Sequence, residues 1–238
     1  MSNIESSYDF YYSQINKNWL KVFNILGSEI IISLKKYIIN KYTTDINTQP
    51  KLEHIFNPFI FTDPYNVKIV IMSHTCDAHS FGLAYSNSTS TKATLNIQNE
   101  IQKEYSDIVK YAINIDPTFE KLAKQGVFMP NIHFFYGKQI EPEFISIFWD
   151  NVFKFLERLG NIIWFAWGDN ETYINKILNI SEDNLNKKKP DDKIVVRTNI
   201  KIRDNIPYGK NFKGNGCFIL ANHYLKQLYI EPIDWLKI

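Results

Sequence analysis

Apolar residues along the chain fall into two patterns, short continuous runs and runs with helical spacing. The continuous runs predict buried strands at 67–72, 161–168 and 193–198. Helical spacing predicts helices at 18–26, at 28–39, from about Leu95, at 148–156 and from Phe218 onward. Residues 1–13 are mostly polar and rich in tyrosine, so we predict a loose N-terminal lead there.

The composition indicates a chain with an extensive packed core. Apolar residues make up 45% of the 238 positions and aromatic residues 15%, which argues against disorder. The two cysteines, Cys76 and Cys217, are too few for a disulfide framework, and the first residues do not have the form of a signal peptide. No apolar run reaches the ~18 residues of a membrane span. We therefore expect an intracellular protein with no membrane partner.

The densest group of reactive side chains follows the first predicted strand. The loop at 73–80 carries His74, Cys76, Asp77 and His79. Ligands of open parallel sheets bind at the carboxyl ends of the strands, so this loop is the first candidate for function. All four side chains are of metal-ligating types, but their spacing matches no known finger or ribbon. We predict no metal and no cofactor.

Two stretches carry a family resemblance. Residues 67–72 (V-K-I-V-I-M) and 82–86 (G-L-A-Y-S) resemble the site-forming strand and loop of the uracil-DNA glycosylases, which read V-K-V-V-I-L and G-L-A-F-S. Residues 122–131 (L-A-K-Q-G-V-F-M-P-N) are similar to the family's W-A-x-Q-G-V-L-L-L-N. The resemblance covers about residue 15 to the C-terminus. It implies an α/β fold, a three-layer sandwich with a central four-stranded parallel sheet, and a single domain over residues 1–238.

The resemblance also implies roles for several residues. Asn131 takes the position that reads the uracil edge, and Tyr85 the position that stacks on the base; the alternative for Asn131 is that it only satisfies the strand end. His74 lies where the base pocket is expected. Ser86 and Thr94 border a hydroxyl-rich loop that either grips a DNA phosphate or is an ordinary capped loop at a helix start.

The catalytic groups of the family do not recur. Its G-Q-D-P-Y-H loop is replaced by S-H-T-C-D-A at 73–78, and no histidine lies between His133 and His223, where the family has H-P-S-P-L-S. We therefore predict a catalytically lapsed homologue that acts as a DNA-binding or replication and repair accessory protein. The alternative is an active but divergent glycosylase. In that case Asp77, two positions past the expected carboxylate, substitutes for it, and His74 or His79 polarises the leaving group.

Basic residues concentrate where the resemblance places the DNA. Residues 187–213 include nine Lys or Arg and three Asp, which gives this segment a net charge of +6 in a chain whose net charge is +2. We predict that the phosphate backbone of DNA contacts four of them, namely Lys201, Arg203, Lys210 and Lys213. The alternative is a solvated linker with scattered lysines. A replication-protein partner is also expected, and a pure protein-interaction module is the third hypothesis.

Overall fold

The computed structural model describes residues 3–89, 91–108, 116–137, 140–178, 199–204, 212 and 216–236, with the backbone alone at 202–204. Four parallel strands form its sheet in the order β2-β1-β3-β4. Their bounds are β1 Ile69–Ile71, β2 Val127–Phe128, β3 Ile163–Trp167 and β4 Ile200–Asp204. The predicted fold class, an α/β fold with a central four-stranded parallel sheet, is confirmed.

Side chains of successive strand residues alternate between two hydrophobic cores, one on each face of the sheet. Val70 and Trp164 belong to the first core, while Ile69, Ile163 and Phe165 belong to the second. Strands that are covered on both faces need apolar residues at every position, and all residues of β1, β2 and β3 are buried. This double burial explains why the strands are continuous apolar runs in the sequence.

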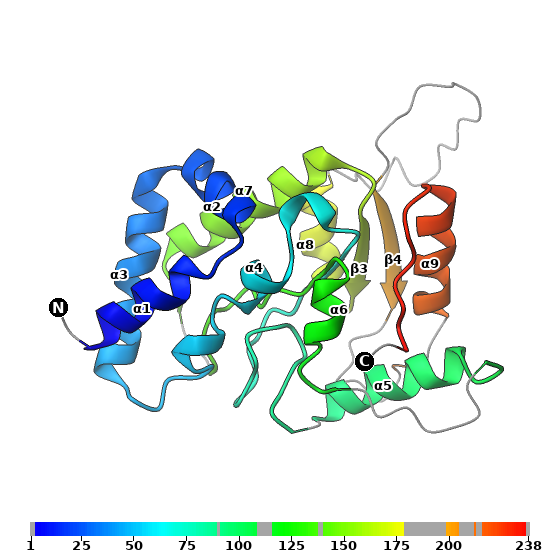
Figure 1. Cartoon of the computed structure of the whole chain (residues 1–238), viewed down its shortest axis with the longest axis horizontal. Coiled ribbons are helices and arrows are strands. Elements are labelled where there is room, and N and C mark those ends of the chain that lie inside the picture. Colours follow the sequence, from blue (N-terminus) through cyan, green and yellow to red (C-terminus); the bar gives the residue numbers. More distant parts are fainter. Residues whose placement is uncertain are drawn as a thin grey trace.

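The first core lies against the N-terminal helices. Figure 1 shows α1, α2 and α3 on one side of the molecule and α9 and α5 on the other, with β3 and β4 between them. The Trp19 indole is fully buried there and stacks on the Phe128 ring at 5.1 Å. The helices of this layer are α1 Asn3–Ser13, α2 Lys17–Leu26, α3 Ser28–Thr44, α4 Asn57–Phe61, α7 Glu143–Leu159 and α8 Asn170–Ile177.

The second core is closed by three helices and the C-terminal tail. These helices are α5 Lys92–Glu104, α6 Glu120–Lys124 and α9 Cys217–Gln227. Trp235 of the tail packs on Phe218 of α9 with ring centroids 4.8 Å apart, so the last turn of the chain belongs to the core. Two short 3-10 helices, η1 Leu52–His54 and η2 Pro64–Asn66, lead into β1. None of the described helices combines the length and the apolar character needed to cross a membrane.

The predicted loose lead at 1–13 is wrong, because most of it is the helix α1. Tyr8 is 1% exposed and packs edge-on against Phe56, and Tyr12 one turn later stacks on Tyr8. Lys35 of α3 pairs with Asp9 at 2.6 Å. Tyrosines spaced four residues apart supply an apolar stripe with polar ends, which the polar composition of the segment concealed.

The fourth strand that the structure describes is β4 Ile200–Asp204. The predicted strand at 193–198 lies outside the described residues and stays a prediction. The pairing of β3 with β4 runs from Ile163 opposite Ile200 to Trp167 opposite Asp204. The sequence of β4, I-K-I-R-D, alternates apolar and charged residues, as is typical of an edge strand. Because Lys201 and Arg203 are basic, the segment is interpreted from the sequence as a DNA contact, and its alternation is not used to predict a strand.

Candidate functional site

The loop after β1 is held by main-chain hydrogen bonds to the segment after β2. The Ser73 amide donates to the Pro130 carbonyl oxygen at 3.1 Å, and the Ile132 amide donates to the Ser73 carbonyl oxygen at 2.8 Å. The Ala84 amide donates to the Met129 carbonyl oxygen at 2.8 Å. Both ends of the loop are thereby fixed to one neighbouring segment. The carboxyl ends of β1 and β2 therefore present their side chains together.

Asn131 is buried at this edge, with 6% of its surface exposed. Its Nδ2 donates to the Gly82 carbonyl oxygen at 3.2 Å. Its Oδ1 is buried without a hydrogen-bond partner among the described residues. The residue lines a cavity of about 10 Å³ with Phe134 and Trp149. A space of this size holds about one water molecule, so no nucleobase fits beside Asn131 in this conformation.

Tyr85 is turned into the second core. Its side chain is 2% exposed, and its ring lies 5.7 Å from that of Trp167. Its hydroxyl donates to the Met72 carbonyl oxygen at 3.2 Å, to which Asn170 Nδ2 also donates, at 2.8 Å. Burial raises the pKa of this hydroxyl well above its usual range. The ring thus packs as a core side chain and has no open face for a base.

The structure does not bring Tyr85 and Asn131 together around one cavity. Tyr85 belongs to the second core, whereas the small cavity beside Asn131 is lined by residues of the first core such as Phe134 and Trp149. His74, the third residue predicted for the base pocket, has its ring 6.2 Å from that of Tyr173 of α8. Burial lowers the pKa of His74, so it is held as a neutral imidazole. Among the described residues Tyr85, Asn131 and His74 thus line no common cavity, and their roles in a base pocket stay a prediction.

A larger cavity opens beside Asp77. It has a volume of about 700 Å³, and His133 lines it together with Thr75 and Asp77. The His133 Nδ1 lies 3.3 Å from a carboxylate oxygen of Glu141, whose side chain is 7% exposed. A hydrogen bond that His133 donates to the Glu141 carboxylate raises the pKa of His133, which favours the cationic imidazolium. The Asp77 carboxyl group and the His133 imidazole, whose protonated form is favoured, therefore line one open cavity at the carboxyl edge of the sheet.

His133 was missed in the sequence because no motif marks it. It lies five residues after the end of β2, as Asp77 lies six residues after the end of β1, and this similar interval is the signal that points to it. His79 lines a different cavity of about 180 Å³ with His54, so it does not share the cavity of Asp77. Among the described residues no group of His, Cys, Asp or Glu side chains could hold a metal ion. Cys76 and Cys217 are both buried free thiols.

Comparison with known proteins gives relatives that match most of the chain. No family model matches the chain. The uracil-DNA glycosylase of Clostridium perfringens strain 13 is 26% identical over 234 residues, which cover 94% of this chain and 97% of that protein. The uracil-DNA glycosylase of Buchnera aphidicola subsp. Cinara cedri is also 26% identical, over 92% of this chain and 94% of its own. The chain is therefore similar to uracil-DNA glycosylases over nearly its whole length.

Solved structures of the uracil-DNA glycosylase fold agree with this. The crystal structure of mimivirus uracil-DNA glycosylase superposes with a TM-score of 0.68 at 18% identity, covering 94% of this chain and 88% of that one. A mimivirus enzyme variant in complex with UGI gives a TM-score of 0.71 at 18% identity, covering 94% and 90%. At these identities the superpositions establish the fold alone.

The hydroxyls predicted to grip phosphate in a uracil-DNA glycosylase site face inward here. Ser86 is fully buried and donates to the Leu83 carbonyl oxygen at 2.6 Å. Thr94 is also fully buried, and its hydroxyl donates to the Tyr85 carbonyl oxygen at 2.8 Å. The Thr91 side chain caps α5 by accepting from the Thr94 amide at 3.2 Å. This geometry is that of the alternative, an ordinary capped loop, and the phosphate contacts of Ser86 and Thr94 stay a prediction.

The basic residues predicted for DNA contact divide into two groups. Lys201 lies in β4, where its ammonium pairs with Glu171 at 3.2 Å and also donates to Asn175. Only 8% of the Lys201 side chain is exposed, so its ammonium is held in an internal ion pair here, and its phosphate contact stays a prediction. The side chains of Arg203, Lys210 and Lys213 lie outside those described, and their phosphate contacts stay a prediction.

Proposed function

We propose that this relative of the uracil-DNA glycosylases binds DNA and does not excise uracil, and that it serves as a replication or repair accessory protein. One observation carries the proposal, the burial of Tyr85 with its hydroxyl bonded to the Met72 carbonyl oxygen. The ring that would stack on a flipped base is already packed on Trp167. Admitting a base would require this core contact to break.

The chemistry expected from the missing groups leads the same way. Thr75 stands where the resemblance expects the carboxylate, and its hydroxyl carries no charge to stabilise a cationic sugar. A positioned acid or base contributes roughly 10²–10⁴-fold in rate. A donor aimed at the leaving uracil contributes roughly 10²–10³-fold. Loss of both removes on the order of 10⁴–10⁶-fold, and less if the groups act as a unit.

An assay of uracil excision from single-stranded DNA tests the proposal that the protein does not excise uracil. The protein is incubated with a uracil-containing oligonucleotide, and abasic sites are revealed by alkaline cleavage. We expect product close to background. Excision at a rate typical of active members of the family would contradict the proposal.

The geometry beside Asp77 favours one second candidate, an active but divergent glycosylase. Asp77 and His133 line one cavity of about 700 Å³, where a carboxylate can support a cationic sugar and an imidazolium can support a leaving anion. If excision is found, Asp77→Ala and His133→Ala should each abolish it. Thr75→Ala, on the wall of the same cavity, is the matched control and should leave it intact.

The test of the DNA-binding half uses charge reversal. We expect sequence-tolerant binding whose logarithm falls linearly with log salt, by about 0.9 per phosphate neutralised on duplex DNA. Three predicted contacts are replaced together by Glu, namely Arg203, Lys210 and Lys213. An equal charge change on exposed lysines of the N-terminal helices is the control, namely Lys17, Lys21 and Lys36.

Fluorescence anisotropy at several salt concentrations distinguishes the two triple variants. The first should bind much more weakly, whereas the control should bind almost as well as the unmodified protein, because exposed charges beyond ~10 Å are screened. Equal effects of the two variants would refute the proposed DNA-binding face. Absence of any binding at low salt would favour the protein-interaction module in its place.

A further inference from the structure

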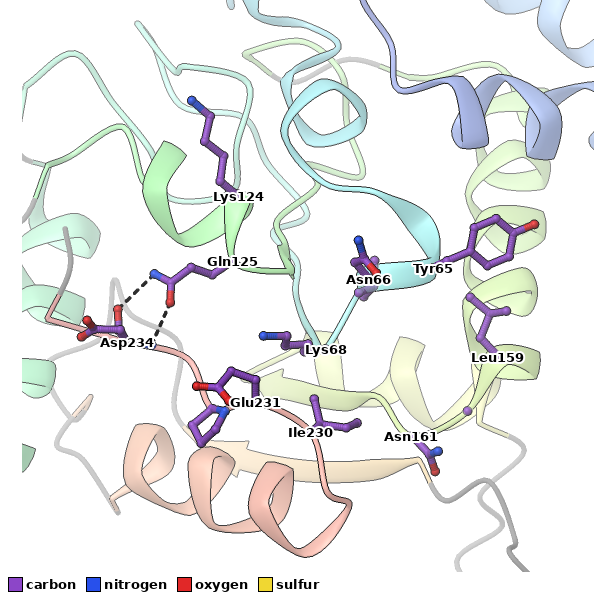
Figure 2. Close-up of a pocket in the computed structure, with 13 residues that line it drawn as sticks. Tyr65, Asn66, Lys68, Lys124, Gln125, Leu159, Asn161, Ile230, Glu231 and Asp234 are labelled. Carbon is purple, nitrogen blue, oxygen red and sulfur yellow. Dashed lines mark hydrogen bonds between the residues drawn. The ribbon is translucent and has the colours of Figure 1, made fainter.

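A second large cavity lies at the opposite edge of the sheet. It has a volume of about 830 Å³ and is lined by residues that come just before strands, such as Lys68 before β1, Gln125 before β2 and Asn161 before β3. Residues 230–234 of the C-terminal tail form another wall (Figure 2). Because all four strands run away from this edge, the cavity is separate from the loop at 73–80 and from the Asp77 cavity.

Lys68 projects into this cavity. Gly126 makes room for it, because a Cβ at that position would lie 3.2 Å from Lys68 Cγ and only 2.4 Å from the Asn66 carbonyl oxygen. The aliphatic part of Lys68 therefore lies across the glycine. Figure 2 shows its ammonium on the side of the cavity where Gln125 and Glu231 lie. A larger residue at 126 would displace this side chain.

The ammonium of Lys68 is not neutralised by the described part of the chain. No described residue forms a hydrogen bond or an ion pair with its Nζ, and Glu231 acts on it only as a nearby charge. Burial lowers the pKa of Lys68, which reflects the cost of holding an unpaired cation there. Lys124 on the same cavity wall differs, because it is exposed and paired with Glu120.

The remaining walls are preorganised and partly apolar. Gln125 fixes the C-terminal tail with two hydrogen bonds, from its Nε2 to the Asp234 carbonyl oxygen at 3.1 Å and from the Asp234 amide to its Oε1 at 2.8 Å. Both bonds are drawn in Figure 2. Leu159 and Ile230 add apolar surface. A cavity of 300–1,000 Å³ with apolar walls and a few fixed polar groups is typical of sites for small molecules.

We propose that this cavity binds a small organic anion, in which a carboxylate or phosphate group pairs with Lys68 and a compact apolar or aromatic body lies against Leu159 and Ile230. The unpaired ammonium selects negative charge, and the apolar walls select an organic body over a bare ion. Glu231 weakens the attraction without abolishing it. The site is independent of DNA binding and of excision, because it lies at the other edge of the sheet.

Isothermal titration calorimetry with defined probes tests the proposal. Phenyl phosphate and benzoate distinguish the two anionic groups, benzyl alcohol tests the need for charge, and inorganic phosphate tests the need for the body. We expect binding of at least one aromatic anion in the range of about 0.1–10 mM, and clearly weaker binding of benzyl alcohol and inorganic phosphate.

Three variants assign the binding to this cavity. Lys68→Met keeps the aliphatic stem and should weaken binding about tenfold, as expected for loss of a charge-assisted contact. Glu231→Gln should strengthen binding severalfold, because a like charge is removed. Lys124→Met is the matched control and should change it less than about twofold, since that ammonium is already paired and exposed.

Several results would overturn the proposal. The first is failure of both aromatic anions to bind at about 10 mM. The second is an equal effect of Lys68→Met and Lys124→Met on binding. The third is binding of inorganic phosphate as tight as that of phenyl phosphate. Thermal denaturation verifies that each variant is folded. If Lys68→Met does not fold, the exposed Glu231→Gln change still decides, because unchanged or weaker binding there contradicts the assigned cavity.

Discussion

Replacement of Gly82 by alanine should destabilise the site edge severely. Gly82 has a φ of +78°, and a Cβ built on it would lie 1.8 Å from the His54 carbonyl oxygen, which is backbone and cannot turn away. Gly216 is a matched control, with a φ of +76° and no described atom within 4 Å of the corresponding Cβ. Both changes to alanine carry the same left-handed backbone cost. Only the Gly82 change adds a collision.

The magnitude follows from the bonds that must move. The left-handed conformation costs an alanine about 1–2 kcal/mol at either glycine. Relief of the 1.8 Å contact displaces the segment around Gly82 and breaks three hydrogen bonds. These run from the Gly82 amide to Ser80 Oγ, from Asn131 Nδ2 to the Gly82 carbonyl oxygen and from Asn57 Nδ2 to the Phe81 carbonyl oxygen. At about 1 kcal/mol for each bond, the total reaches about 4–5 kcal/mol.

Thermal and urea denaturation followed by circular dichroism measure the difference. A chain of this size shifts its midpoint by about 2–4 °C per kcal/mol, so Gly82→Ala should unfold roughly 10 °C below Gly216→Ala. Comparable midpoints for the two variants would refute the reasoning. They would mean that the loop at 73–86 tolerates displacement and that the closed pocket around Asn131 is not rigid.

Three further results are expected. Tyr85→Phe removes one buried hydroxyl bond and should cost about 1 kcal/mol in the free energy of unfolding by urea titration; no loss would mean that the hydroxyl does not hold the ring. Lys201→Met should destabilise by about 2 kcal/mol, because Glu171 loses its partner, and Lys201→Met with Glu171→Gln should recover part of this in the same titration. The raised pKa of His133 stabilises the fold fully below pH ~6.5, and this contribution is lost as pH rises through the raised value; Glu141→Gln should flatten that change in urea midpoints measured from pH 5 to 8.

The sequence predicts the strands well where both faces of the sheet are covered by other elements. Runs such as 67–72 and 161–168 are apolar at every position because both faces are covered, and β1 and β3 fall inside them. Prediction fails where only one face is buried. In α1 five of the eleven residues are exposed, and in β4 the Lys201 side chain is held in an ion pair, so polar composition conceals the periodicity of both elements.

The candidate site is harder to predict, because the resemblance gives positions and not side-chain directions. Asn131 and Tyr85 lie at the expected strand ends, but one contacts the first core and the other packs into the second. Small rotations about a side chain decide whether such residues meet, and these depend on packing partners distant in sequence, such as Trp167. The nearness of His133 to Asp77 likewise requires knowing that the segments after β1 and β2 are paired.

The main-chain pairing of those two segments has a consequence for how this edge can change. The main-chain bonds between the two segments, such as Ser73 amide to Pro130 oxygen and His133 amide to His74 oxygen at 3.0 Å, do not depend on side-chain identity. Any residue that keeps its amide hydrogen can therefore replace another at these positions without loss of the frame. Different side chains can therefore be substituted at this edge while its backbone bonds are kept. A lineage can discard one set of reactive groups and acquire another there while the fold stays the same.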